Sequence, residues 1–186
     1  MKPISFSPSS PPSSLSKASG DVVRLVVKNF LTLDDVDCSL GKLTIFIGPQ
    51  AEGKSLLAKL VDFFYESLNT AIYHDDYKSL KGHISNRFLR TFPKRIWEND
   101  NFAISFFISS YLITIEYAKK RLYIRFNPTL EKDIKKFFSS KKELEKSDQP
   151  SIFSWISQNI HDFPYPFRIR PTFIPALRQL FSYAGF

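Results

Sequence analysis

The apolar residues of this chain fall into short runs that predict strands and helices from about residue 21 onward. "DVVRLVVKNF" (21–30) is rich in valine and predicts a strand, and "DDVDCSL" (34–40) predicts a second one. After Gly41, the continuous apolar run "KLTIFI" (42–47) predicts a third, buried strand. The segment "KSLLAKLVDFFYESL" (54–68) then has apolar residues at helical spacing and predicts an amphipathic helix: Leu56, Leu57, Leu60, Val61 and Phe64.

Three β-rich runs in the middle of the chain predict an antiparallel meander over residues 100–127. They are "NFAISFFISS" (101–110), "YLITIEYAKK" (111–120) and "RLYIRFNP" (121–128), with "AKKR" as the turn between the last two. Just before them, Arg87 to Trp97 ("RFLRTFPKRIW") interleaves basic and aromatic residues. That pattern is compatible with nucleic-acid contact, but we favour an interpretation in which the aromatics enter the core and the charges stay solvated.

The remaining segments predict helices, a final strand and a disordered leader. Residues 129–146 predict a charged helix, part of a helical segment over 129–161, with one apolar stripe and a Glu131–Lys135 pair at i,i+4 spacing. A shorter helix is predicted over 151–160, and a C-terminal strand and tail over 167–186. The Ser/Pro-rich residues 1–20 predict a disordered leader, which leaves 21–186 as one folded unit. The apolar stripe of residues 129–146 consists of Leu130, Ile134, Phe137 and Phe138.

Net charge, aromatic content and cysteine count limit the kinds of partner and site that this chain can have. The 186 residues carry 26 Lys and Arg against 18 Asp and Glu, a net charge of +8 that favours an anionic partner, although the cations are spread along the sequence. Nineteen Phe and eight Tyr argue for a packed core or for an exposed surface that needs a partner. A single cysteine, Cys38, excludes internal disulfides and cysteine-cluster metal sites, so a cytoplasmic setting is expected. No run reaches the roughly 18 apolar residues of a membrane span.

The segment "GPQAEGKS" (48–55) carries the most specific chemistry. It matches the phosphate-binding pattern G-x-x-x-x-G-K-[ST], between a predicted strand and a predicted helix. Glycines let successive backbone N–H groups point at phosphate oxygens, and the helix that follows adds its positive end. In this pattern Lys54 reaches the β- and γ-phosphates, and the Ser55 hydroxyl is a ligand of Mg²⁺. The predicted nucleotide contacts are therefore Gly48, Pro49, Gln50, Ala51, Glu52, Gly53, Lys54 and Ser55.

Glu52 stands at a loop position where a carboxylate would oppose a triphosphate. It is harmless if its side chain points away from the loop, as loop side chains commonly do. It weakens binding if it faces the phosphates.

The sequence from residue 22 to 66 resembles the ABC-like AAA ATPases. These include the heads of structural-maintenance-of-chromosomes and recombination proteins, and the overcoming-lysogenisation-defect, Septu and retron defence ATPases. In that group a strand ending in "NF", here Asn29–Phe30, is followed by a hairpin and then by an apolar strand with "GPxxxGKS". A second similarity is "TFIPALR" (Thr172 to Arg178), which resembles the "IPAxR" segment of the defence ATPases.

The resemblance implies an α/β P-loop NTPase fold, as the N-terminal lobe of such an ATPase with its antiparallel meander and an incomplete core sheet. It implies ATP and Mg²⁺ as ligands, Thr32 and Arg178 as further nucleotide contacts, and a homodimer when the ATPase is complete. Many family members have a basic residue followed by serine where this chain has Leu31 and Thr32. Ser55 is the one metal ligand that the resemblance assigns.

Several family elements have no counterpart in the sequence. No apolar strand ending in Asp-Glu follows the loop, since "LITIE" ends in Glu116 without an aspartate and "AIYHDD" (71–76) comes too soon. A signature segment and a switch histidine are also missing, and the three histidines, His74, His83 and His161, stand apart from any catalytic motif. We therefore expect hydrolysis to require a second lobe, with an open sheet edge and apolar surface where that lobe would join.

Two function classes follow from these observations. The first is nucleotide binding by a partial ATPase in DNA-linked or anti-phage work, with a missing lobe or an effector protein as partner. The second is a non-catalytic remnant or protein-interaction module that keeps the fold. A basic nucleic-acid module that does not use ATP is a more distant third, and no membrane partner is expected.

Overall fold

Five strands and three α-helices make up the computed structural model, which describes residues 23–41, 43–97 and 101–145. The leader, the 151–160 helix and the C-terminal segment that includes Arg178 were predicted from sequence and lie outside the described residues. The strands are β1 (Val23–Phe30), β2 (Leu33–Leu40), β3 (Phe102–Ile108), β4 (Tyr111–Ala118) and β5 (Arg121–Phe126). The helices are α1 (Lys54–Asn69), α2 (Tyr77–Thr91) and α3 (Pro128–Glu145), with short 3₁₀ turns η1 (Thr70–Tyr73) and η2 (Lys94–Ile96).

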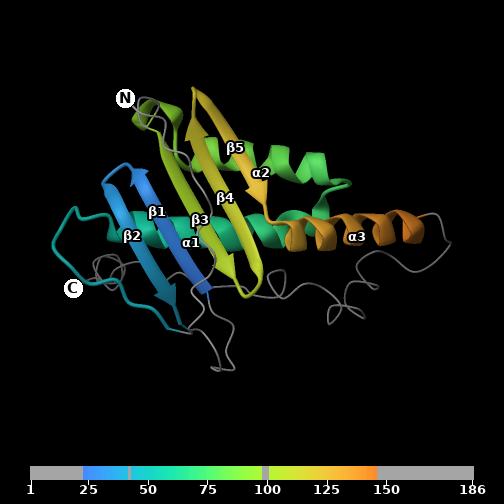
Figure 1. Cartoon of the computed structure of the whole chain (residues 1–186), viewed down its shortest axis with the longest axis horizontal. Helices are drawn as coiled ribbons and strands as arrows, with labels where there is room; N and C mark the ends of the chain where they lie inside the picture. Colours follow the sequence, from blue (N-terminus) through green and yellow to red (C-terminus); the bar gives the residue numbers. More distant parts are fainter. Residues whose placement is uncertain (1–22, 42, 98–100, 146–186) are drawn as a thin grey trace, which may run out of the picture.

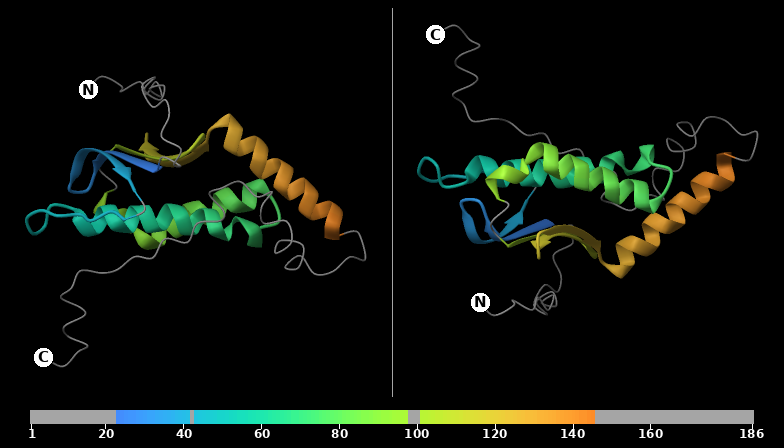
Figure 2. Two further views of the ribbon diagram at one scale, coloured as in Figure 1. Left: turned by 90° about the horizontal axis from the view of Figure 1, so that it is seen from below. Right: turned by 90° about the horizontal axis from the view of Figure 1, so that it is seen from above.

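The strands form one sheet in the order β2-β1-β3-β4-β5, and every neighbouring pair is antiparallel. Helices α1 and α2 are inserted between β2 and β3 and lie together against one face of the sheet (Figures 1 and 2). Strand β1 therefore pairs with β3 across about seventy residues of sequence, with Leu25 opposite Phe106 and Val27 opposite Ile104. The architecture is α/β with two layers, and the core lies between them.

Period-two alternation explains which face of each strand is buried. In β1 the residues Val23, Leu25 and Val27 face the helices and are buried, while the intervening positions are only half-buried. Phe64 of α1 stacks on Phe106 of β3, with ring centroids 4.8 Å apart. The large apolar side chains that are exposed among the described residues are leucine, isoleucine and tyrosine. The described phenylalanines are all buried or half-buried, and most of them belong to the core.

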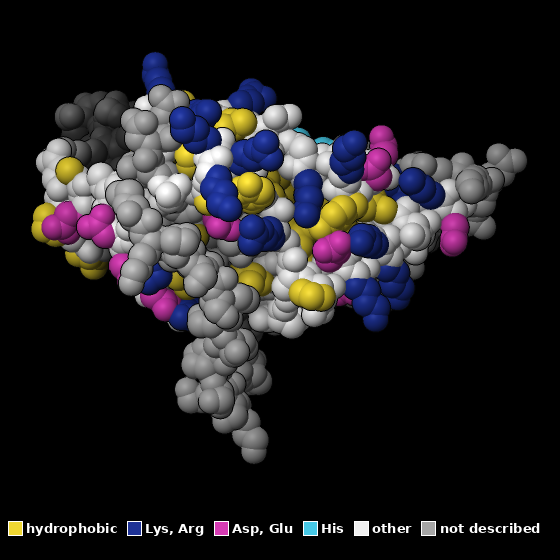
Figure 3. All heavy atoms as spheres, turned by 45° about the horizontal axis from the view of Figure 1, so that its top comes forward, with side chains coloured by type: hydrophobic (Ala, Val, Ile, Leu, Met, Phe, Trp, Pro, Cys, Tyr) yellow, Lys and Arg dark blue, Asp and Glu magenta, His cyan; other side chains and the backbone are white. Residues whose placement is uncertain are grey.

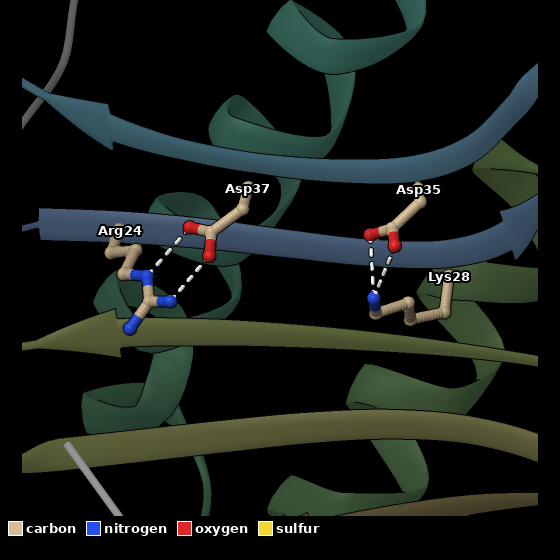
Figure 4. Close-up of polar contacts among 4 residues, drawn as sticks. All are labelled: Arg24, Lys28, Asp35 and Asp37. Atoms are coloured by element: carbon tan, nitrogen blue, oxygen red, sulfur yellow. Dashed lines mark hydrogen bonds and ion pairs between the residues drawn. The ribbon is translucent and has the colours of Figure 1, made fainter. Parts of the chain in front are cut away.

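The opposite face of β1 and β2 carries ion pairs (Figure 4). Arg24 donates through Nε to Asp37 at 2.6 Å, and Lys28 Nζ contacts both oxygens of Asp35 at 2.6 Å. The guanidinium of Arg24 lowers the pKa of Asp37 through the hydrogen bond between them. These cross-strand ion pairs favour the same register of β1 against β2 as the apolar contacts on the buried face.

Most strand predictions for this region are confirmed. The strands at 23–30 and 33–40 and the meander of β3, β4 and β5 are present, and the meander is antiparallel as predicted. The tight turn between β4 and β5 has positive φ at Lys119 and Lys120, 52° and 60°, which suits a two-residue hairpin turn.

The prediction of a buried strand at 42–47 is wrong. Residues 43–47 form no strand, and their alternate apolar side chains are exposed: Leu43 by 79%, Ile45 by 69% and Ile47 by 88%. A strand requires a neighbour for its backbone hydrogen bonds, and none of the described strands pairs with this segment. The apolar pattern is present without the sheet that would bury it.

The helical predictions are confirmed for α1 and α3, whereas α2 was not predicted. In α3, Leu130, Ile134 and Phe138 are buried, and the Glu131–Lys135 ion pair forms at 2.7 Å. The aromatics between residues 87 and 97 enter the core, which confirms the favoured interpretation of that segment. They are Phe88, Phe92 and Trp97, and the Trp97 indole donates to the Phe92 carbonyl at 2.9 Å.

No helix among the described residues combines the length and apolar character that crossing a membrane requires.

A comparison of a buried and an exposed apolar residue tests this fold. Phe30 is fully buried against Phe88, Phe92 and Phe102, so Phe30→Ala should lower the free energy of unfolding by about 3–5 kcal/mol. Ile45→Ala removes an exposed side chain and should change it by less than about 0.5 kcal/mol. Urea denaturation monitored by circular dichroism measures both. A loss of several kcal/mol for Ile45→Ala would show that residues 43–47 are packed in this chain.

Candidate nucleotide-binding site

The Gly48–Ser55 loop connects the extended segment 43–47 to the first turn of α1, and it protrudes beyond the sheet at the left of Figure 1. Residues 48–52 are exposed, whereas Gly53 and Lys54 are half-buried. The loop therefore has an accessible outer part and an inner end that packs on the protein.

Gly53 anchors this inner end. Its φ is +82°, a left-handed conformation that glycine adopts without strain, and it is the N-cap residue of α1. A Cβ at this position would lie 2.5 Å from Leu33 Cδ2 and 3.1 Å from Thr32 Oγ1. Both the conformation and the space require glycine, and both place the start of α1 against the turn between β1 and β2.

The N-terminus of α1 has its backbone donors available. None of the described side chains caps this end, and the first turn contains no acidic residue. The first N–H groups of a helix have no intrahelical acceptor, and the helix dipole adds partial positive charge there. This helix end is therefore suited to receive an anion.

Lys54 bends back over the loop. Its Nζ donates a hydrogen bond to the backbone carbonyl of Pro49, which brings the ammonium group across the loop from the helix. A Cβ built on Gly48 would lie 3.9 Å from this Nζ. Ser55, the predicted Mg²⁺ ligand, is exposed on the first turn of α1.

Glu52 also bends toward the loop. A Cβ on Gly48 would lie 3.2 Å from Glu52 Oε2, so the carboxylate shares the neighbourhood of Gly48 with the Lys54 ammonium. The sequence left the direction of this side chain open. In the structure it lies where it adds negative charge to a loop that is otherwise suited to an anion.

Thr32 lies beside Gly53, as the hydroxyl distance above indicates, so the structure brings this predicted contact to the inner end of the loop. Phe30 of the "NF" element is a core residue, and Asn29 has a positive φ of 53° at the end of β1.

Two of the acidic residues in the segments that were excluded as the acidic strand, Asp76 and Glu116, have partners in the structure. Asp76 caps α2 by accepting a hydrogen bond from the Ser79 N–H at 2.7 Å, and Glu116 pairs with Arg125 at 3.2 Å. Within the described ranges no group of three or more His, Cys, Asp or Glu side chains is arranged to hold a metal ion. Ser55 remains the candidate metal ligand on this part of the chain.

Two histidines that sequence analysis treated separately lie in contact. The rings of His74 and His83 are 4.5 Å apart, and burial lowers the pKa of both. The buried Lys141 of α3 donates to the His74 carbonyl at 2.8 Å and joins α3 to the end of η1. No sequence pattern indicates the contact between the two histidines, because their rings meet only through the packing of α2.

Comparisons with known proteins give one distant relationship. No family model matches the chain, and no solved structure matches it. The OLD nuclease of Thermus scotoductus (strain ATCC 700910 / SA-01) is 46% identical over 39 residues, which is 21% of this chain and 7% of that protein. The chain is therefore distantly linked to the ATPase family of OLD and structural-maintenance-of-chromosomes proteins, through a segment that spans a small part of its relative.

A pair of glycine substitutions tests the geometry of the loop. Gly53→Ala should lower the free energy of unfolding by about 1–3 kcal/mol, because the methyl group meets Leu33 and the backbone is left-handed. Gly82 lies inside α2 with no atom within 4 Å of a built Cβ, so Gly82→Ala should raise it by roughly 0.5–1 kcal/mol. Urea denaturation of both variants measures whether the free energy of unfolding falls for Gly53→Ala and rises for Gly82→Ala. A neutral Gly53→Ala would contradict the packing of the loop on Leu33.

Proposed function

We propose that this chain binds ATP with Mg²⁺ at Gly48–Ser55, as the N-terminal lobe of an ABC-like ATPase. The observation that carries the proposal is the joint arrangement of three features: the left-handed Gly53, the uncapped N-terminus of α1 and the Lys54 ammonium folded over the loop. Together they favour a polyphosphate, and Gly53 and Lys54 belong to the sequence pattern that phosphate-binding loops share.

Each loop residue has a separate role in this proposal. The backbone N–H groups at the start of α1 would hold phosphate oxygens, and Lys54 would exchange the Pro49 carbonyl for the β- and γ-phosphates. Ser55 would supply a hydroxyl ligand to Mg²⁺, which neutralises phosphate charge when bound. Thr32, fixed beside Gly53, would contact the nucleotide from the turn between β1 and β2.

Hydrolysis would depend on a second lobe. The segment that leads into the loop exposes Leu43, Ile45 and Ile47 on alternate positions, the pattern of a strand that lacks its neighbours. A lobe that pairs with this segment would complete the core sheet and supply the acidic strand; Arg178 is the further contact expected from the C-terminal region. The distant link to an OLD nuclease favours DNA-linked or anti-phage work in the cytoplasm, with a homodimer as the complete ATPase.

A second candidate is a non-catalytic protein-interaction module that retains the fold. The exposed apolar segment 43–47 favours it, since such a surface suits a protein partner with or without nucleotide. A measurement of phosphate release by the purified chain distinguishes both candidates from an enzyme that hydrolyses ATP without a second lobe. Both expect no turnover by the chain alone, whereas Mg-ATP binding is expected only for the first.

Substitution of Lys54 tests nucleotide binding directly. Lys54→Ala should weaken Mg-ATP binding about a hundredfold, because a charge-assisted hydrogen bond contributes up to about 3 kcal/mol. Lys59→Ala is the matched control, since it removes an exposed lysine of the same helix and should leave binding unchanged. Ser55→Ala should weaken binding in Mg²⁺ but not in EDTA. Titration calorimetry measures all three, and absence of binding by the unsubstituted chain would remove the proposal.

Neutralisation of Glu52 should have the opposite effect on Mg-ATP binding. Glu52→Gln should strengthen Mg-ATP binding about fivefold, because a nearby carboxylate costs roughly 1 kcal/mol against a polyphosphate. Glu143→Gln removes an exposed carboxylate from α3 and should have no effect. The same titration checks both variants at low salt. An affinity unchanged by Glu52→Gln would show that this side chain turns away when nucleotide binds.

A further inference from the structure

Two imidazole rings and one ammonium group meet where the end of η1, the middle of α2 and the second half of α3 come together. They belong to His74, His83 and Lys141, and we name these three residues the histidine junction. The Lys141 side chain is only 8% exposed, and its Nζ also lies 3.4 Å from Oδ1 of the exposed Asp75. A buried cation therefore lies beside a pair of histidines that contact each other.

Helix α3 is attached to the protein differently along its two halves. It slants from the end of β5 toward the η1 end of the helical layer (Figure 2). In the first half Ile134 is buried, and Asp133 accepts a hydrogen bond from Tyr111 of β4 at 2.8 Å. Among the described side chains of the second half, Phe138 and Lys141 are the buried ones. Lys141 therefore contributes much of the attachment of this half.

The ring nitrogens of the junction are poorly placed for a second proton. Both rings are half-buried, and histidine appears only as small patches on the face drawn in Figure 3. Nδ1 of His74 lies 3.3 Å from the Ser79 hydroxyl, but Nε2 of both rings is buried and has no hydrogen-bond partner among the described residues. A protonated ring has two N–H donors, so protonation would leave a charged, buried donor without an acceptor.

Nearby positive charge adds to this cost. Burial is the largest cause that lowers the pKa of both rings. The His83 ring and Lys141 of α3 lower the pKa of His74 further, and Arg87 of α2 lowers that of His83. Each ring would therefore take up a proton next to a group that is charged already or would be charged by the same change in pH.

Two carboxylates face the rings and oppose this effect. Asp75 follows His74 in the chain, and its side chain is 90% exposed, so water screens its charge. Glu66 of α1 faces His83, but it forms an ion pair with Arg87. Both carboxylates therefore compensate a protonated ring only in part.

We propose that the histidine junction is a pH-sensitive contact, which holds the second half of α3 at neutral pH and releases it when the two rings take up protons. Charged rings would repel the Lys141 ammonium, and the repulsion is relieved when Lys141 moves away with its part of the helix. The first half stays attached through Ile134 and the hydrogen bond of Asp133. Release would expose Phe138, which lies one turn before Lys141 and is 4% exposed.

Acid weakens this contact because the rings have lower pKa values when α3 is docked than when it is released. A histidine in water has a pKa of about 6.5. Well above that pH neither state binds the protons, so the full stability of the contact is present. As the pH falls through about 6.5, the released state takes up protons first and the contact weakens, until the docked rings are protonated as well.

Hydrogen exchange of the whole chain, measured by mass spectrometry at pH 7.5 and 5.5 and corrected for the intrinsic exchange rate, tests the proposal. The protection of residues 137–145 should fall about tenfold at the lower pH, since one pKa unit is a factor of ten in an equilibrium constant, while that of β3 should not change. His74→Gln combined with His83→Gln should reduce the fall to less than about twofold. His161→Gln removes the third histidine as the matched control and should retain the full fall.

A proton NMR titration of the histidine rings keeps the test decisive if the double variant does not fold. In the unsubstituted chain, His74 and His83 should both titrate below about 6.5. Lys141→Met removes the cation that faces His74 and should raise the pKa of His74 more than that of His83.

Other outcomes overturn the proposal. An equal loss of protection in β3 would show a general effect of acid, and a fall that persists in the double variant would show that other groups titrate. No fall, or ring pKa values at or above about 6.5, would show that the junction does not respond to acid. None of these measurements uses ATP, and the junction lies at the far end of α1 from the nucleotide loop, about 24 Å away at 1.5 Å per residue, so failure here leaves ATP binding untouched.

Discussion

The packing of Phe30 is the contact on which the rest of the structure depends. This side chain ends β1 and meets Phe88 and Phe92 of the helical layer and Phe102 of β3, so it joins both layers at one end of the sheet. The turn that follows it precedes Leu33 at the start of β2, and Leu33 leaves no room for a Cβ on Gly53. The position of the candidate nucleotide loop thus follows from an aromatic core contact.

The segment 43–47 shows why an apolar pattern does not by itself make a strand. Its residues have the composition of a buried strand, yet Leu43, Ile45 and Ile47 are exposed. The sheet of the described residues already has its two edges in β2 and β5, and neither pairs with this segment. A strand forms only where another backbone pairs with its N–H and C=O groups. The residues of the segment itself do not show whether such a partner is present.

The sequence predicted the features that local physics determines. Valine-rich alternation predicted β1, and helical spacing predicted α1 and α3. Helix α2 could have been predicted, because Asp76 precedes Leu80, Ile84 and Phe88 at four-residue spacing, the pattern of a capped amphipathic helix. The long-range pairing of β1 with β3 and the contact of His74 with His83 could not, since they depend on the packing of the helices between them.

The same distinction applies to charge and to the candidate nucleotide site. The cations are spread along the sequence, and the fold pairs some of them with acidic residues of other elements, such as Arg24 with Asp37 and Arg87 with Glu66. The helix that follows the nucleotide loop is held in the core, since Phe63 of α1 packs against Phe88 of α2 with ring centroids 5.6 Å apart. A substitution of Lys54 leaves that contact in place, so the candidate site can be altered without unfolding the protein.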